Sequence, residues 1–314
     1  MRVLVYGAGG LGSVFGGFLA RNGHDVTLLG REWHLSVVRR EGLVIDGIWG
    51  QYRIRACETA TDPSQVRTDR PYDLVLLTVK SYDTTAAAAA LKPFVGPETT
   101  VLSLQNGLGN MEAMLASGLS AENLLIGRVI FGVRTEPGVA TVTVSADPVA
   151  IGSVPGAVPR LSAFKMASLL TSCKIEAVSV EDIRPVIWSK VVYNCALNPL
   201  GALYALPYGR IPMEPSTCSA MQAVVRECYA VASAEGVRLE PADAEAYLRH
   251  LTQALIPKTG GHYPSMLEDL RRGRKLEIDA LNGAIVRLGA RHGIATPANA
   301  ALVEELQRRR PVSA

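Results

Sequence analysis

Hydrophobic residues in the first half of the chain fall into short continuous runs separated by helical stretches. The runs are rich in Val, Leu and Ile and lack strict alternation, as expected of parallel strands that are buried on both faces. They lie at 2–7, 25–30, 72–80, 99–107 and 123–133, with helices predicted at 11–22 and 83–92. Residues 138–152 alternate more regularly and predict an antiparallel strand at an edge of the sheet. This order predicts a doubly wound α/β domain.

The pattern changes after about residue 181, where strand-like runs disappear and helical periodicity takes over. The predicted helical segments are 184–204, 215–236, 241–255, 265–292 and 299–310. We therefore predict two domains, an α/β domain over residues 1–180 and an all-α domain over residues 181–314.

A glycine-rich loop opens the chain between the first predicted strand and the first predicted helix. Gly7, Gly9 and Gly12 form the pattern G-x-G-x-x-G in this context. The first glycine allows a tight turn, the second lets the backbone approach a pyrophosphate, and the third lets the helix pack close to the strand. The pattern predicts a Rossmann-type site that binds a dinucleotide through residues 7–12, namely Gly7, Ala8, Gly9, Gly10, Leu11 and Gly12.

The end of the second predicted strand indicates which dinucleotide is bound. An NAD site usually has an acidic residue here, which grips the ribose 2′-hydroxyl. In this chain Arg31 is the residue in reach, and a cation there suits a 2′-phosphate. Glu32 follows directly and argues for NAD, and Arg31 would otherwise be an ordinary surface residue. We favour NADP(H) as the cofactor.

Two further polar positions follow predicted strands of the sheet, where ligands of such folds bind. Lys80 ends the third run, and Asn106 with Gly107 ends the fourth. A terminal lysine often extends to water and Asn-Gly is a common turn, so each alone fits a structural role. Together they are candidates for holding cofactor and substrate.

The predicted helix at 184–204 carries a polar stripe on an otherwise apolar sequence. Lys190, Asn194 and Asn198 are spaced four residues apart, so each lies only about 40° around the helix axis from the last. A structural explanation is a lysine paired with a carboxylate, with both asparagines bonding the backbone. Pro199 is predicted to end or kink the helix directly after the stripe.

A later segment supplies possible partners for this stripe. Glu277 lies among apolar residues and is a plausible partner for Lys190, and Ser265 precedes a helix, where a hydroxyl suits an anion. A nicotinamide with a lysine acid, amides and a hydroxyl predicts reduction of a small 2-keto acid. Lys190 would polarise and protonate the carbonyl oxygen, while the amides and Ser265 hold the carboxylate and any distal hydroxyl.

Composition excludes several other classes of protein. The formal charge is only +3, so nothing in the overall charge indicates nucleic acid or a membrane surface. The five cysteines are scattered without a CxxC pair, which predicts neither disulfides nor a metal site and fits a cytoplasmic location. No apolar run is long enough for a membrane span, and no signal peptide is recognised. Oligomeric state is not fixed by the sequence, and a homodimer is one expectation.

The motifs together resemble the ketopantoate reductase family across nearly the whole chain. They are GAGGLGS, TVKSYD, QNGLGN, WSKVVYNCALNPLGAL, PSMLEDLRRGRKLEID and HGIATPAN, in the order found in the family. The resemblance implies NADPH-dependent reduction of 2-dehydropantoate to (R)-pantoate, on the route to pantothenate and coenzyme A. It further implies the following site residues: Lys190 as catalytic lysine, Glu277 beside it, Asn194, Asn198 and Ser265 for the substrate, Lys80 and Asn106 on the cofactor side, and Arg31 at the 2′-phosphate.

Two departures from the family pattern and three alternatives remain open. Tyr208 stands where relatives often have an asparagine near the substrate, and Leu276 stands where they usually have threonine. The first departure bears on the shape of the pocket. The alternatives are a reductase of another 2-keto acid, a 3-hydroxyacid dehydrogenase, and a non-catalytic NADP-binding sensor.

Overall fold

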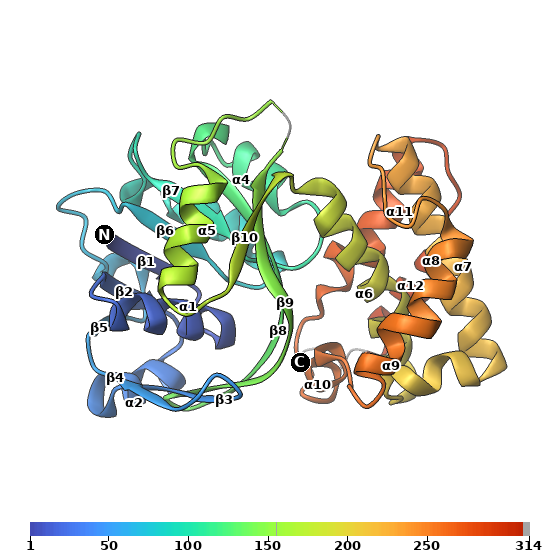
Figure 1. Cartoon of the computed structure of the whole chain (residues 1–314), viewed down its shortest axis with the longest axis horizontal. Coiled ribbons are helices and arrows are strands. Elements are labelled where there is room, and N and C mark those ends of the chain that lie inside the picture. Colours follow the sequence, from blue (N-terminus) through green and yellow to red (C-terminus); the bar gives the residue numbers. More distant parts are fainter. Residues whose placement is uncertain (155, 310–314) are drawn as a thin grey trace. The chain divides into compact units, whose positions relative to one another are not determined.

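The computed structural model describes residues 1–154 and 156–309, which form two compact units (Figure 1). The first unit comprises Met1–Gln105 and Asn110–Ile183 and contains the sheet. The second comprises the chain from Arg184 onward, together with the loop Asn106–Gly109. A short piece of the first half of the sequence therefore packs with the helical unit.

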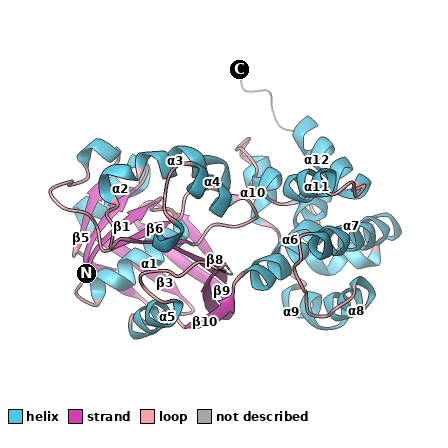
Figure 2. Cartoon of the chain, turned by 90° about the horizontal axis from the view of Figure 1, so that it is seen from above, coloured by secondary structure: helices cyan, strands magenta, loops and turns pink. Residues whose placement is uncertain are grey.

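One sheet of ten strands forms the centre of the first unit among the described residues (Figure 2). Its strand order is β4-β3-β9-β8-β7-β6-β1-β2-β5, with β10 paired to β9. The strands are β1 (Arg2–Tyr6), β2 (Asp25–Leu29), β3 (Leu43–Gly47), β4 (Tyr52–Ile54), β5 (Cys57–Ala60), β6 (Leu74–Leu77), β7 (Thr100–Ser103), β8 (Leu124–Glu136), β9 (Val139–Ser153) and β10 (Ala177–Asp182). The α/β class predicted from the runs is confirmed.

The central strands are parallel, and β1 pairs with β2 on one side and β6 on the other. All four residues of β6 are buried, which explains why its run has no polar alternation. The strand predicted at 138–152 forms as β9, antiparallel to β8. Its predicted edge position is wrong, because β9 also pairs with β3 and β10.

Helices cover both faces of this sheet. They are α1 (Gly10–Arg21), α2 (Glu32–Glu41), α3 (Thr84–Ala90), α4 (Asn110–Ala116) and α5 (Ala163–Ser172), with 3₁₀ turns at Pro63–Gln65 (η1), Ser81–Asp83 (η2), Lys92–Phe94 (η3) and Ala121–Asn123 (η4). α1 lies very close to the strands, because a Cβ added to Gly16 would be 2.6 Å from Leu28 Cδ2. Glycine in this helix thus lets it pack directly on β2.

The helical unit is built around α6 (Arg184–Tyr204) and α7 (Pro215–Ala234). Its other elements are η5 (Tyr208–Met213), α8 (Ala244–His250), the π-helical η6 (Leu251–Leu255), α9 (Ile256–Thr259), α10 (Ser265–Arg271), η7 (Glu277–Ala280), α11 (Asn282–Arg291) and α12 (Pro297–Arg308). α6 has the predicted bounds and passes through Pro199 without ending there. The single helix predicted at 265–292 is wrong: Gly273 takes a φ of +62° after α10, and three shorter elements result.

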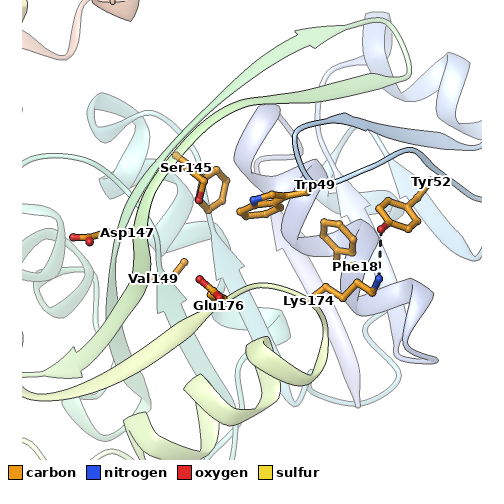
Figure 3. A pocket seen from close by; sticks show the side chains of 9 residues that line it. Phe18, Trp49, Tyr52, Ser145, Asp147, Val149, Lys174 and Glu176 are labelled. Atoms are coloured by element: carbon orange, nitrogen blue, oxygen red, sulfur yellow. Dashed lines mark hydrogen bonds between the residues drawn. The ribbon is translucent and has the colours of Figure 1, made fainter. Parts of the chain in front are cut away.

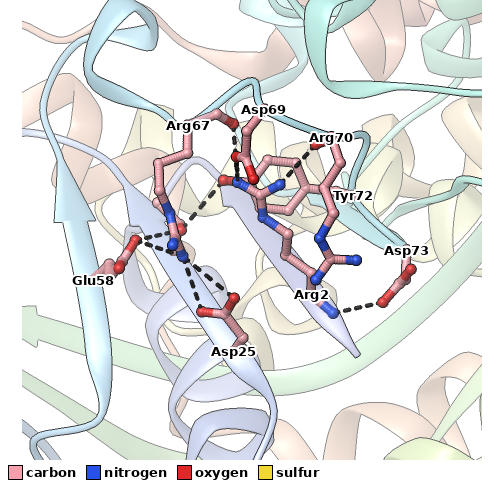
Figure 4. A network of polar contacts seen from close by, with 9 residues as sticks. Arg2, Asp25, Glu58, Arg67, Asp69, Arg70, Tyr72 and Asp73 are labelled. Atoms are coloured by element: carbon pink, nitrogen blue, oxygen red, sulfur yellow. Dashed lines mark hydrogen bonds and ion pairs between the residues drawn. The ribbon is translucent and has the colours of Figure 1, made fainter.

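A polar network fixes the start of β1 (Figure 4). The Arg2 side chain is 2% exposed; its guanidinium bonds Asp69 at 2.7 Å and the Arg70 carbonyl at 2.7 Å, and it stacks on the ring of Tyr72. The backbone N–H of Arg2 donates to Asp73 at 2.6 Å. This network ties β1 to the loop before β6 at the ends of the strands opposite the glycine loop, so its role is structural.

Candidate active site

The glycine loop turns sharply at the end of β1. Gly7 has a φ of +114°, and the N–H groups of Gly7 and Ala8 both donate to the Leu29 carbonyl, at 3.0 and 2.7 Å. A Cβ on Gly7 would lie 2.6 Å from the backbone nitrogen of Val79. Only glycine satisfies both the dihedral angle and this close approach.

The start of α1 has the features of a phosphate site. Gly9 is the exposed N-cap residue of α1 and provides no side-chain cap. A Cβ placed on Gly9 would meet only the Gly7 carbonyl oxygen, at a distance of 4.0 Å. Gly12 is packed instead, since its Cβ would lie 2.5 Å from that same oxygen. The first N–H groups of a helix and its dipole favour an anion. These residues therefore fit the pyrophosphate of a dinucleotide.

Arg31 lies beside this loop, directly after β2. The preceding Gly30 passes so close to Ala8 that a Cβ on Gly30 would be 3.0 Å from the Ala8 Cβ. Arg31 is exposed, and within residues 1–154 and 156–309 no carboxylate forms an ion pair with it. The neighbouring Glu32 is paired with Arg39 at 3.6 Å. An exposed arginine without an ion pair at this position fits a 2′-phosphate.

A buried histidine, which the sequence analysis did not single out, connects α1 to α2. His34 is 1% exposed, and its Nε2 lies 2.9 Å from the Ser13 hydroxyl oxygen. Its Nδ1 lies 3.1 Å from the Glu136 carbonyl oxygen and 3.2 Å from the Gly138 nitrogen. Burial lowers the pKa of His34, so the neutral ring is favoured in the fold.

The two polar stretches after β6 and β7 are linked to each other. The Gln105 side-chain amide donates to the Val79 carbonyl at 3.0 Å and to the Thr84 hydroxyl at 2.7 Å. Lys80 is half-buried and lies between these two contacts in sequence, at the start of η2. The segments that carry Lys80 and Gln105 are therefore neighbours within the sheet unit.

The polar stripe on α6 has the predicted form. Lys190, Asn194 and Asn198 are half-buried, whereas Val191 and Cys195 beside them are fully buried. The Lys190 ammonium donates to the side-chain oxygen of Asn106 at 2.5 Å. The stripe therefore belongs to a partly accessible face of a helix that is otherwise in the core of the helical unit.

The loop that carries Asn106 also contacts the segment that carries Glu277. The N–H of Leu108 donates to the Ala280 carbonyl at 2.8 Å, and a Cβ on Gly107 would lie 2.5 Å from that oxygen. Ala280 ends η7, which begins at Glu277, and Glu277 is half-buried. Lys190, Asn106 and the η7 segment thus share one neighbourhood of the helical unit.

Ser265 is the exposed first residue of α10. Pro264 before it packs on α6, since a Cβ on Gly201 would be 2.9 Å from the Pro264 Cδ. Gly201 lies one turn beyond Asn198, so Ser265 begins a helix seated on the C-terminal part of the stripe helix.

Comparison with known proteins places these features in a family. Residues 3–156 match the family described as ketopantoate reductase PanE/ApbA, and residues 182–310 match its C-terminal domain. The chain belongs to the ketopantoate reductase family. A 2-dehydropantoate 2-reductase of Aquifex aeolicus is 37% identical over 95% of this chain and 94% of its own, and one of Halobacterium salinarum is 37% identical over 95% of each.

Solved structures agree with this assignment. A PanE/ApbA family ketopantoate reductase from Ralstonia eutropha has a TM-score of 0.86 at 32% identity, covering 99% of this chain and 98% of that one. A D-mandelate dehydrogenase in complex with NADH and anilino(oxo)acetate has a TM-score of 0.88 at 25% identity, with the same coverage.

Tyr208, which departs from the family pattern, contacts the stripe directly. Its hydroxyl donates to the side-chain oxygen of Asn198 at 2.5 Å. The ring is 4% exposed and packs edge-on against Tyr193 and His262. Burial raises the pKa of Tyr208 well above its usual range, so the phenol keeps its proton and remains a donor. The sequence indicates that position 208 is unusual, but it does not reveal the hydrogen bond between Tyr208 and Asn198.

A recess of about 340 Å³ lies elsewhere in the sheet unit of this ketopantoate reductase (Figure 3). Its walls include the rings of Phe18, Trp49 and Tyr52, and Lys174 donates to the Tyr52 hydroxyl at 3.4 Å. No residue predicted for the active site lines it. Among the described residues no group of acidic, histidine or cysteine side chains could hold a metal ion, and none of their helices could cross a membrane.

Proposed function

We propose that this ketopantoate reductase reduces 2-dehydropantoate to (R)-pantoate with NADPH. The observation that carries the proposal is the Lys190–Asn106 hydrogen bond of 2.5 Å, at one end of a helical stripe that presents two further amides. An ammonium and amides in one line are what a 2-keto acid requires, because its carbonyl and carboxylate oxygens accept hydrogen bonds from such donors.

Residues 1–180 would hold the cofactor and residues 181–314 would supply the substrate chemistry. The open backbone at Gly9, the uncapped start of α1 and the cation of Arg31 support binding of NADP(H) by residues 7–12 and Arg31, with Lys80 and Asn106 at the nicotinamide side. Bound NADPH supplies a hydride to the carbonyl carbon of the substrate.

The side chains of the helical unit would provide the proton and the orientation. Lys190 donates a hydrogen bond to the carbonyl oxygen and transfers its proton there as the negative charge develops. Asn194, Asn198 and Ser265 hold the carboxylate and the distal hydroxyl of the substrate. Glu277 lies on the segment that contacts the Asn106 loop and is the proposed partner of Lys190.

A turnover assay tests this proposal. The purified protein is mixed with ketopantoate and either NADPH or NADH, and the loss of the reduced nicotinamide absorbance is followed. We expect turnover with ketopantoate and a higher kcat/KM with NADPH. NADPH binding without turnover on any 2-keto acid would instead support the sensor, and oxidation of 3-hydroxyacids alone would support the 3-hydroxyacid dehydrogenase.

A second candidate is a reductase of an aromatic 2-keto acid. It is favoured by the D-mandelate dehydrogenase structure, which contains anilino(oxo)acetate, and by the aromatic Tyr208 beside Asn198. Assaying phenylglyoxylate beside ketopantoate separates the two candidates. A kcat/KM that is tenfold higher for phenylglyoxylate would replace the first proposal with the second.

The proposal extends to a cytoplasmic homodimer. Cys195 and Cys228 are buried free cysteines, which fits a reducing compartment. Tyr204 and Met213 are exposed apolar side chains of the helical unit, at 54% and 70%, and offer surface for a second copy. Sedimentation of the purified protein tests the homodimer, and fractionation of cells tests the cytoplasmic location.

A further inference from the structure

Pro199 creates a gap in the hydrogen bonding of α6 at the centre of the proposed substrate stripe. Proline has no N–H, so the carbonyl four residues earlier, that of Cys195, lacks the i→i−4 hydrogen bond that an ordinary helix residue would give it. The helix nevertheless continues to Tyr204, and Cys195 is fully buried. A buried carbonyl without a donor is costly, so the fold has to supply a donor from elsewhere.

Asn282 supplies that donor. Its side-chain Nδ2 donates to the Cys195 carbonyl at 3.2 Å, and the residue is 0% exposed. Asn282 is the first residue of α11 and comes from a part of the sequence 87 positions away. The amide therefore takes the place of the N–H that Pro199 lacks.

Two further residues hold this amide in place. The same Nδ2 donates to the side-chain oxygen of Asn299 at 2.9 Å, and the Asn299 amide donates to the Glu227 carboxylate at 2.7 Å. That carboxylate also accepts the backbone N–H groups of Ala298 and Asn299, at 2.8 and 2.9 Å. The hydrogen bonds therefore connect α7, α12, α11 and α6 in one network, in which the Asn282 amide donates to both of its neighbours and the Glu227 carboxylate accepts at the far end.

The bridged carbonyl lies between the two asparagines of the stripe. Cys195 follows Asn194 directly and precedes Asn198 by three residues. The turn that sets the spacing of the two amides is therefore the one that Pro199 leaves open. A binding constellation has to be held to within roughly 0.5 Å, and side chains that fix the backbone beneath it provide that precision.

We propose that Asn282, held by Asn299 and Glu227, is a positioning residue that sets the geometry of Asn194 and Asn198 by closing the gap at Pro199. This inference rests on the proposed function insofar as the two asparagines bind the substrate. It also makes a claim about the helix itself, which can be tested without turnover.

The decisive variant is Asn282→Asp, which keeps the shape of the side chain but has no N–H to donate. We expect kcat/KM for ketopantoate to fall at least tenfold, mainly through KM, while the Kd for NADPH stays within twofold. Glu227→Gln should act in the same direction with a smaller loss, because glutamine keeps one of the two acceptor oxygens and loses the charge. Glu227→Gln also tests the proposal if the Asn282→Asp variant does not fold.

A matched control is available in the sheet unit. Asn123 is also buried, and its side-chain amide donates to the carbonyls of Gly96, Pro97 and Thr99, far in sequence from α6. Asn123→Asp should lower the melting temperature without changing KM for the 2-keto acid. An equal rise in KM in this variant would show that loss of any buried amide acts through general destabilisation, and would overturn the proposal.

The gap itself is tested by restoring the missing donor. Pro199→Ala returns an N–H to position 199. In the Pro199→Ala protein, Asn282→Asp should therefore lower kcat/KM less than threefold. An unchanged cost, or a folded Asn282→Asp enzyme with kcat/KM within twofold of the parent, would refute the role of Asn282.

The double-mutant cycle of Pro199→Ala and Asn282→Asp can also be measured by thermal unfolding. It then tests the bridge even if the enzyme turns over no 2-keto acid. Smaller destabilisation by Asn282→Asp in the Pro199→Ala background would support the bridge while the proposed function fails. Equal destabilisation in both backgrounds would reject the bridge independently of activity.

Discussion

Replacing Lys190 by alanine removes the proposed proton donor and leaves the glycine loop and Arg31 unchanged. A positioned general acid typically contributes a factor of about 10²–10⁴ to the rate. At about 1.36 kcal/mol for each factor of ten, this corresponds to a loss of roughly 3–5 kcal/mol of transition-state stabilisation. The NADPH Kd should hardly change, because the glycine loop and Arg31 belong to the sheet unit and do not depend on this side chain.

A structural cost accompanies the loss of rate. The ammonium donates to Asn106 at 2.5 Å, and a hydrogen bond from a charged group contributes about 1.5–3 kcal/mol. Because Lys190 and Asn106 are both half-buried, water can replace part of this bond, and the lower end of the range is expected. The loss of stability is therefore smaller than the loss of transition-state stabilisation.

The assay compares kcat for ketopantoate with the NADPH Kd from a fluorescence titration, on protein shown to be folded. Lys190→Arg keeps the charge but is a poor proton donor at neutral pH, so it should also lose rate. Lys258→Ala, an exposed lysine of α9, is the matched control and should leave both quantities unchanged. Equal losses of kcat and NADPH affinity in Lys190→Ala would show that the lysine is structural and would refute the assigned role.

Three further changes probe the sheet unit. Arg31→Ala should raise KM for NADPH about 10- to 100-fold and hardly change KM for NADH, since only the former has a 2′-phosphate; an unchanged preference in kinetics would remove Arg31 from the site. Gly12→Ala would bring a methyl group to 2.5 Å from the Gly7 oxygen, so a titration should show weaker NADPH binding. Burial lowers the pKa of His34, so its contribution to stability is complete above about pH 6.5 and is lost as the pH falls below that value. The gap in melting temperature between the parent and His34→Gln should accordingly narrow on acidification, and a constant gap would contradict this.

Local sequence signals were sufficient for much of the fold. Runs without polar alternation predicted the central strands, because a strand covered on both faces has no polar side. The strands β3, β4, β5 and β10 were missed. Each is only three to six residues long, and β3 and β5 pair with strands that are distant in sequence. The break at Gly273 carried a glycine signal, but the continuing helical periodicity on both sides outweighed it.

The chemistry of the stripe could be predicted, but its contacts could not. Spacing alone places Lys190, Asn194 and Asn198 on one face of α6. The hydrogen bond from Lys190 goes to Asn106, which lies 84 positions earlier in the chain. The sequence indicated a role for each residue separately, and pairing with Glu277 stays a prediction. Contacts between segments so far apart are fixed by the fold and leave no local pattern.

Tyr208 shows how a departure from the family pattern can preserve the chemistry of a site. The phenol keeps its proton because burial raises its pKa, and it donates that proton to the carbonyl oxygen of the Asn198 amide. The Nδ2 group of Asn198 is then available to donate a hydrogen bond to a ligand. A donor at this position suits oxygen atoms of a carboxylate, a carbonyl or a hydroxyl group and disfavours an ammonium or amide N–H. Tyrosine here therefore favours an oxygen atom of the substrate at the Asn198 end of the stripe, and ketopantoate has such oxygen atoms.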